Sequence, residues 1–115
     1  MSTTLSAAIA PLIERKIFAN EEVAIRELLE AYMLQQMASL QRELRRFERK
    51  YGMRFQQFSE YLHERSVLLE SGELSPEQCQ VLGQAIMQEE DDWLDWKVAR
   101  EMLESWLGLR QEASA

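Results

Sequence analysis

Residues that break or bend a helix are scarce in this sequence. Its 115 residues include four glycines, two prolines, one cysteine and one histidine. So few turn-forming residues leave little means of joining several strands, and we therefore predict an all-α fold. The single cysteine, Cys79, excludes a disulfide within the chain and is typical of a reducing compartment. With His63 as the only histidine, a His/Cys zinc site also lacks ligands, and we expect no cofactor.

Long apolar runs are absent as well. No stretch of 18 apolar residues occurs, so we predict no membrane-spanning helix. No positively charged segment precedes an apolar stretch at the N-terminus, so we expect no secretory signal and a cytoplasmic protein. Apolar residues still make up 46% of the chain, which is enough for a core.

Charge is divided unevenly along the chain. Residues 1–50 carry eight Lys/Arg and seven Asp/Glu, whereas residues 51–115 carry five and thirteen. The basic surplus of the first half is a cluster that we call the basic face: Arg42, Arg45, Arg46, Arg49 and Lys50. The acidic surplus of the second half is concentrated at residues 89–95. Opposite patches of this kind favour pairing with each other, within or between protomers, or with a partner protein.

A long central helix is predicted between Asn20, a good N-cap, and Gly52, a good C-cap glycine. Its apolar positions recur at intervals of four and three residues, which is the spacing of a helix-pairing seam. We interpret this seam as a homodimer interface formed by Met33, Met37, Leu40, Leu44 and Phe47. The basic face falls on the opposite side of the same helix.

The C-terminal half is predicted to form a helical hairpin. One helix begins near Phe55 and ends near Ser71-Gly72, and Ser75-Pro76-Glu77-Gln78 forms a capping box for the next. The last helix is expected to stop at Gly108. The predicted organisation is a dimerisation segment at residues 1–52, a helical region at 53–110 and a frayed tail at 111–115.

Two constellations of acidic residues suggest function. Acidic residues beside tryptophans are suited to covering a basic site on another protein, so we predict a partner-binding surface formed by Glu89, Asp92, Trp93, Asp95 and Trp96. Core packing against Phe47, Phe55 and Phe58 is the alternative for at least two of the three tryptophans. In the other constellation, carboxylates three residues apart on two helices resemble the E-x-x-E and E-x-x-D pairs of all-α nucleotide pyrophosphohydrolases. That resemblance implies a magnesium site formed by Glu27, Glu30, Glu89 and Asp92.

The N-terminal segment resembles the helices of ribbon-helix-helix proteins. The resemblance is carried by Phe18 and Asn20, followed by a helix that starts with Glu22, Ile25 and Arg26. It implies a dimeric bacterial repressor or antitoxin that binds operator DNA, with residues 2–6 as a short strand paired between protomers. Pro11, inside the expected first helix, suits that helix only if it begins near residues 8–10.

A second resemblance is to a group of small bacterial proteins with a K-Y-G-M segment before a helix that starts F-x-x-F, and with an acidic D-x-x-W close. Here the first segment is Lys50-Tyr51-Gly52-Met53. Members of that group are often encoded beside toxin-like partners. The function expected from the sequence is therefore that of a non-enzymatic, dimeric, antitoxin-like protein that masks a partner. A metal-dependent hydrolase and a structural or adaptor helical bundle remain alternatives.

Overall fold

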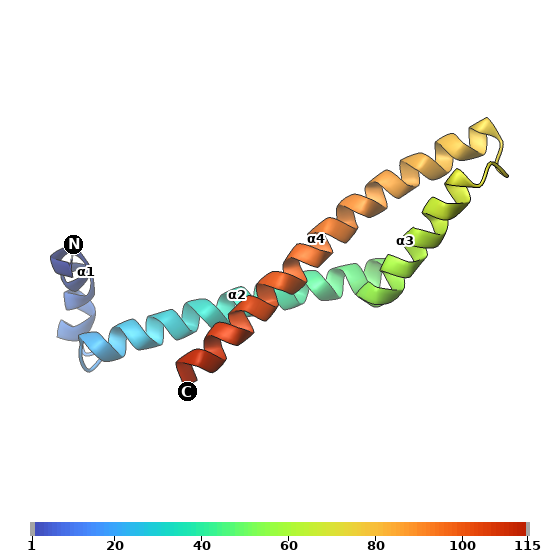
Figure 1. Ribbon diagram of the computed structural model, residues 1–115. Coiled ribbons are helices and arrows are strands. Elements are labelled where there is room, and N and C mark those ends of the chain that lie inside the picture. The colour runs from blue at the N-terminus through green and yellow to red at the C-terminus, as the bar shows by residue number, and fades with distance from the viewer. Residues whose placement is uncertain (1, 115) are drawn as a thin grey trace. The chain divides into compact units, whose positions relative to one another are not determined.

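The described part of the chain consists of four helices and contains no strand (Figure 1). The computed structural model describes the backbone of residues 2–114 and the side chains of residues 4–112. The chain divides into two compact units, Met1–Ala38 and Ser39–Ala115, and the boundary between these ranges falls within the second helix. The all-α prediction is confirmed.

Helix α1 spans Ser2–Glu14 and carries Pro11 inside it. The predicted strand at residues 2–6 is therefore wrong, and so is a helix start near residue 8. A helix pairs its backbone groups within its own segment, whereas a strand needs a neighbour. Pro11 lacks the N–H that would bond one turn back, and the helix ends soon after it. Lys16 then takes a left-handed backbone conformation, with φ of 59°, in the turn that follows.

Helix α2 spans Glu21–Tyr51, as the sequence predicts. The Asn20 side-chain oxygen accepts a hydrogen bond from the Val23 N–H at 2.9 Å, which satisfies one of the unpaired donors of the first turn. Glu21 and Glu22 lie in that turn, where the helix dipole favours negative charge. Gly52 ends the helix with φ of 63°, a conformation that glycine adopts without strain.

Helices α3 (Phe55–Glu70) and α4 (Pro76–Ser114) form the predicted hairpin. Figure 1 shows α3 running back beside the first part of α4, and the two helices pack together. The capping box is confirmed, because Gln78 N–H donates to Ser75 Oγ at 3.2 Å while Gln78 Oε1 accepts from Ser75 N–H at 2.9 Å. The predicted stop at Gly108 is wrong: α4 continues to Ser114, since a single helical glycine weakens a helix without ending it. Fraying of residues 111–114 stays a prediction, and Ala115 lies outside the described residues.

The core of the second unit is a cluster of four buried side chains: Phe47 from α2, Phe58 and Leu62 from α3, and Trp96 from α4. Leu44 and Tyr51 pack against this cluster. The seam of α2 is therefore the more buried side of that helix, as its spacing predicts. Its assignment as a dimer interface needs correction at Leu44 and Phe47, because these two side chains pack inside their own chain.

The first unit has little core of its own. Ile9 of α1 and Ala24 and Met37 of α2 are buried, whereas Leu28 and Leu29 remain exposed. A two-helix unit of this size has too few apolar contacts to bury all its large side chains. Within the described residues, no helix has the length and apolar content needed to cross a membrane.

Candidate functional site

Helix α4 carries most of the residues that suggested function, and its inner face is built around Trp96. This ring stacks on Phe47 and Phe58 with 5.5 Å between centroids in each pair. Phe55 meets it edge-on, also at 5.5 Å. Only 1% of Trp96 is exposed, so its place in the predicted partner-binding surface is wrong and the ring belongs to the core. Offset stacks of this kind add stability beyond their buried area.

Trp93 lies one turn before Trp96 at the edge of the core. Its indole N–H donates a hydrogen bond to Ser59 Oγ at 2.8 Å, and its ring stacks on Phe55 at 5.8 Å. The Lys97 ammonium lies 5.3 Å from the ring centroid. Core packing is therefore confirmed as the role of two of the three tryptophans, although the partly buried Trp93 keeps some surface.

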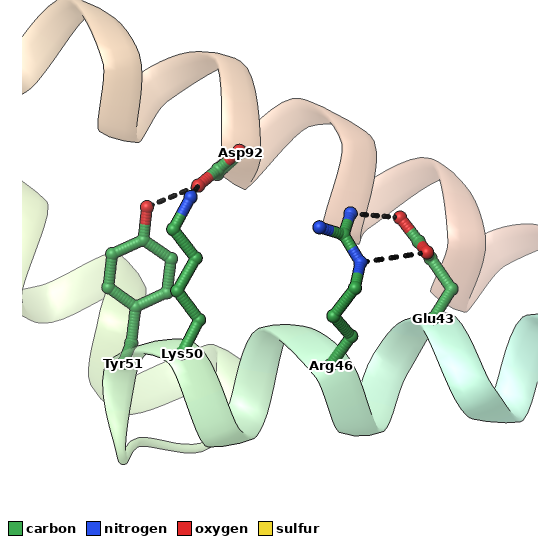
Figure 2. A network of polar contacts seen from close by, with 5 residues as sticks. All are labelled: Glu43, Arg46, Lys50, Tyr51 and Asp92. Atoms are coloured by element: carbon green, nitrogen blue, oxygen red, sulfur yellow. Dashed lines mark hydrogen bonds and ion pairs between the residues drawn. The ribbon is translucent and has the colours of Figure 1, made fainter.

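Asp92 joins the end of α2 to α4 through two hydrogen bonds (Figure 2). Lys50 Nζ donates to Asp92 Oδ2 at 2.6 Å, and the Tyr51 hydroxyl donates to the same oxygen. Burial alone would raise the pKa of the Asp92 carboxyl, but the bonds from Lys50 and Tyr51 outweigh it and hold this pKa below its ordinary value. Burial and the neighbouring carboxylate raise the pKa of Tyr51. This contact is one pairing between the basic and acidic clusters, and it lies within the chain.

Glu89 makes a second ion pair one turn earlier on α4. Arg65 of α3 donates from Nη1 to Glu89 Oε1 at 3.0 Å, and the same nitrogen contacts the Tyr61 hydroxyl. Arg65 Nε and Glu89 Oε2 are buried and make no hydrogen bond among the described residues. Glu89 and Asp92 therefore hold α4 against its neighbours. Of the five residues predicted for partner binding, Asp95 is the one that is exposed.

The four carboxylates proposed for magnesium have different surroundings. Glu27 and Glu30 are exposed in the first unit, whereas Glu89 and Asp92 are each paired with a cation in the second. In the described part of the chain, no group of three or more His, Cys, Asp or Glu side chains is placed to hold a metal ion. The hydrolase alternative stays a prediction that has no geometric support of its own.

The basic face of α2 is exposed along its length. Two of its members are engaged within the chain: Lys50 with Asp92, and Arg46 with Glu43 at 2.7 Å (Figure 2). The hydrogen bond from Arg46 lowers the pKa of the Glu43 carboxyl. Arg42, Arg45 and Arg49 are exposed on the same helix. The intrahelical Glu43–Arg46 pair is the arrangement expected of a solvated helix surface.

His63 lies on the surface of α3, as predicted. Ser59 and Ser66 line the same shallow hollow, one turn before it and one turn after it. The Ser59 hydroxyl donates to the Phe55 carbonyl at 3.0 Å and accepts from Trp93, so it is already committed to structure. Ser59 is therefore not placed as a nucleophile activated by His63.

The opposite side of α4 is the surface that the sequence reasoning missed. Leu94, Val98 and Met102 follow one another at intervals of four residues, with exposed fractions of 52%, 50% and 46%. Successive residues of an α-helix are rotated by roughly 100° about its axis. Met87 and Leu109 therefore lie within the same sector of about 80° as these three residues, on the side of α4 away from Trp96. These five residues form what we call the outer stripe: Met87, Leu94, Val98, Met102 and Leu109. Their spacing is visible in the sequence, but the aromatic residues of the inner face drew the prediction to the wrong side.

Exposed carboxylates accompany the outer stripe along α4. We consider the half of the α4 surface that is centred on the stripe, over residues 87–112. All exposed charged residues there are acidic, and we call them the acidic rim: Glu90, Asp91, Asp95, Glu101 and Glu112. Two exposed cations lie nearby, and each is close to an aromatic ring: Lys97 lies over Trp93, and the Arg100 guanidinium lies 4.4 Å from the Phe55 ring centroid. The outer face of α4 thus combines exposed aliphatic side chains with negative charge.

Comparison with protein-family models, with curated proteins and with solved structures gave no match. The residues that carry the ribbon-helix-helix resemblance lie at the turn into α2, where Asn20 caps the helix and Glu22 pairs with Arg26 at 3.0 Å. That resemblance stays a prediction.

Proposed function

We propose that this chain is a non-enzymatic, antitoxin-like binding protein that covers a partner protein with the outer face of α4. The single observation that supports the proposal is the outer stripe. A helix with apolar residues on both sides is normally covered on both sides, and here the core covers only the inner one. Contiguous exposed apolar side chains on a small protein are typical of interaction surfaces.

The inner face supplies the rigidity that such a surface requires. Trp96 is locked by its ring contacts, and the Asp92 and Glu89 ion pairs fix two further turns of α4. The outer stripe is therefore presented on a pre-ordered helix, which lowers the entropy lost on binding. Methionines at Met87 and Met102 add side chains that adapt to a partner's shape.

Homodimerisation through α2 belongs to the same proposal, restricted to the part of the helix before Leu44. Residues 31–41 contain no charged side chain, and just before them Leu28 and Leu29 are exposed in the first unit. An uncharged apolar surface meets its own copy without like-charge repulsion. Operator binding stays a prediction, and the strand on which it relied is helical here.

The proposal is tested by co-expression with the product of the neighbouring reading frame. We expect the two proteins to co-purify and the chain to relieve growth arrest caused by that product. The double variant Leu94→Gln with Val98→Gln should lose both effects while remaining folded, because both side chains are half exposed and glutamine is a good helix former.

The matched control is Val81→Gln. Val81 is an exposed aliphatic residue of the same helix that lies off the outer stripe, and its replacement should leave co-purification unchanged. A double variant that co-purifies as well as the wild type would place the partner elsewhere and overturn the proposal.

A further inference from the structure

The outer stripe has a feature that restricts the partner beyond being apolar. Its five aliphatic residues are accompanied along the helix by the five carboxylates of the acidic rim, and the neighbouring cations lie over rings of the inner face. A partner segment seated on the stripe must therefore place its own flanks against negative charge. Like charges brought together at such a surface oppose binding.

We infer that the occupant of the outer stripe is an amphipathic helix of a partner protein whose apolar side is flanked by lysine and arginine. This inference rests on the proposed function and names the class of partner that it takes. The apolar residues of the stripe recur at intervals of four along α4. A partner helix lying along α4 can pack against them, because an amphipathic helix presents its own apolar residues at intervals of three and four. The acidic rim would then pair with the basic flanks of that helix.

A second copy of the same surface is a poorer occupant. Two outer stripes laid against each other would bring two acidic rims together, which makes ten carboxylates. The half of the α4 surface that carries the stripe has no exposed lysine or arginine to pair with them. The charges of the rim therefore favour a different chain. Screening sets the scale of the effect, since exposed charges interact over a Debye length of about 8 Å at physiological salt.

The test uses the full chain and two synthetic helical peptides of equal length. Both peptides carry leucines at intervals of four and three residues, one with lysine and arginine on the flanks and the other with glutamate and glutamine. We expect the basic peptide to bind about tenfold more tightly at low salt, since several partly screened charge pairs act together. The difference should shrink as salt is raised.

Two variants separate the apolar and charged contributions. Leu94→Gln with Val98→Gln should abolish binding of the basic peptide. Asp91→Asn with Asp95→Asn and Glu101→Gln should keep binding but remove the preference between peptides. The control, Glu60→Gln with Glu64→Gln and Glu73→Gln, neutralises three exposed carboxylates that belong neither to α4 nor to the acidic rim, and it should retain the preference.

The outcomes are distinct. Equal binding of both peptides through Leu94 and Val98 would overturn the basic-partner inference and leave the proposed function standing. A stripe-dependent homodimer in sedimentation, lost in the Leu94→Gln/Val98→Gln variant, would replace the partner with a second copy and also overturn the inference. Loss of co-purification with the neighbouring product in the Val81→Gln control alone would instead contradict the proposed function.

Discussion

The two faces of α4 are both apolar and yet differ in kind. The inner face has an aromatic residue, Trp96, locked by stacked rings at 5.5 Å and bordered by ion pairs. The outer face has unstacked aliphatic side chains that are about half exposed, with five exposed carboxylates among and beside them. The difference teaches that apolar periodicity locates a helix face, whereas the neighbouring residues decide whether that face serves the fold or a partner.

The largest expected contrast is between Trp96 and Leu94. Trp96→Ala should destabilise the protein by about 3–5 kcal/mol, because it removes a fully buried ring and leaves a cavity. Leu94→Ala should change the free energy of unfolding by less than about 0.5 kcal/mol, because a half-exposed surface residue has few contacts to lose. Urea denaturation followed by circular dichroism measures both. If both variants lost the same free energy of unfolding, the outer face would also belong to the core.

The ion-pair border of the inner face should appear in the pH dependence of stability. The folded pKa of Asp92 lies below its unfolded value, so its stabilisation is present above about pH 4 and is lost as the pH falls through the folded pKa. Asp92→Asn should lower the free energy of unfolding near neutral pH by about 1 kcal/mol. It should also make the free energy of unfolding fall less steeply as the pH is lowered below about 4. The urea midpoint measured between pH 2 and 7 in both proteins tests this. If the difference in urea midpoint between the two proteins were the same at every pH, the charge of the Asp92 carboxylate would not contribute to stability.

Tyr51 should act at the other end of the pH range. Its folded pKa is raised, so its contribution is present below the unfolded value near 10 and is lost as the pH rises through the folded pKa. Tyr51→Phe should therefore show a shallower loss of stability above pH 10 than the wild type. Thermal unfolding in alkaline buffers provides the measurement, with Tyr32→Phe in the first unit as the matched control.

The smallest expected effect is that of magnesium. Glu89 and Asp92 are occupied by Arg65 and Lys50, so millimolar magnesium should leave the melting temperature unchanged. A ligand that binds only the folded state would raise it by mass action. A rise that is abolished by Glu27→Gln with Glu30→Gln would revive the hydrolase alternative.

The helices were largely predictable because their signals are local. Asn20, Gly52 and the Ser75–Gln78 capping box each act within one turn, and the structure has a boundary at each. The candidate site was predictable only in part. Asp92 and Trp96 look like surface groups in a sequence, because their neighbours Lys50 and Phe47 lie more than 40 residues away. The outer stripe was missed because two apolar faces on one helix leave no local signal for which of them the core covers.

Helix α2 passes unbroken from one compact unit into the other, and this continuity has a consequence for amide hydrogen exchange. Its last turns are held by Phe47 in the core of the second unit, whereas its first turns carry exposed leucines. Amides near Phe47 should exchange only through global opening, and those near Leu28 through local fluctuations. The exchange rates of successive amides along α2 would then locate the residue at which protection by global folding of the second unit changes to protection against local opening alone.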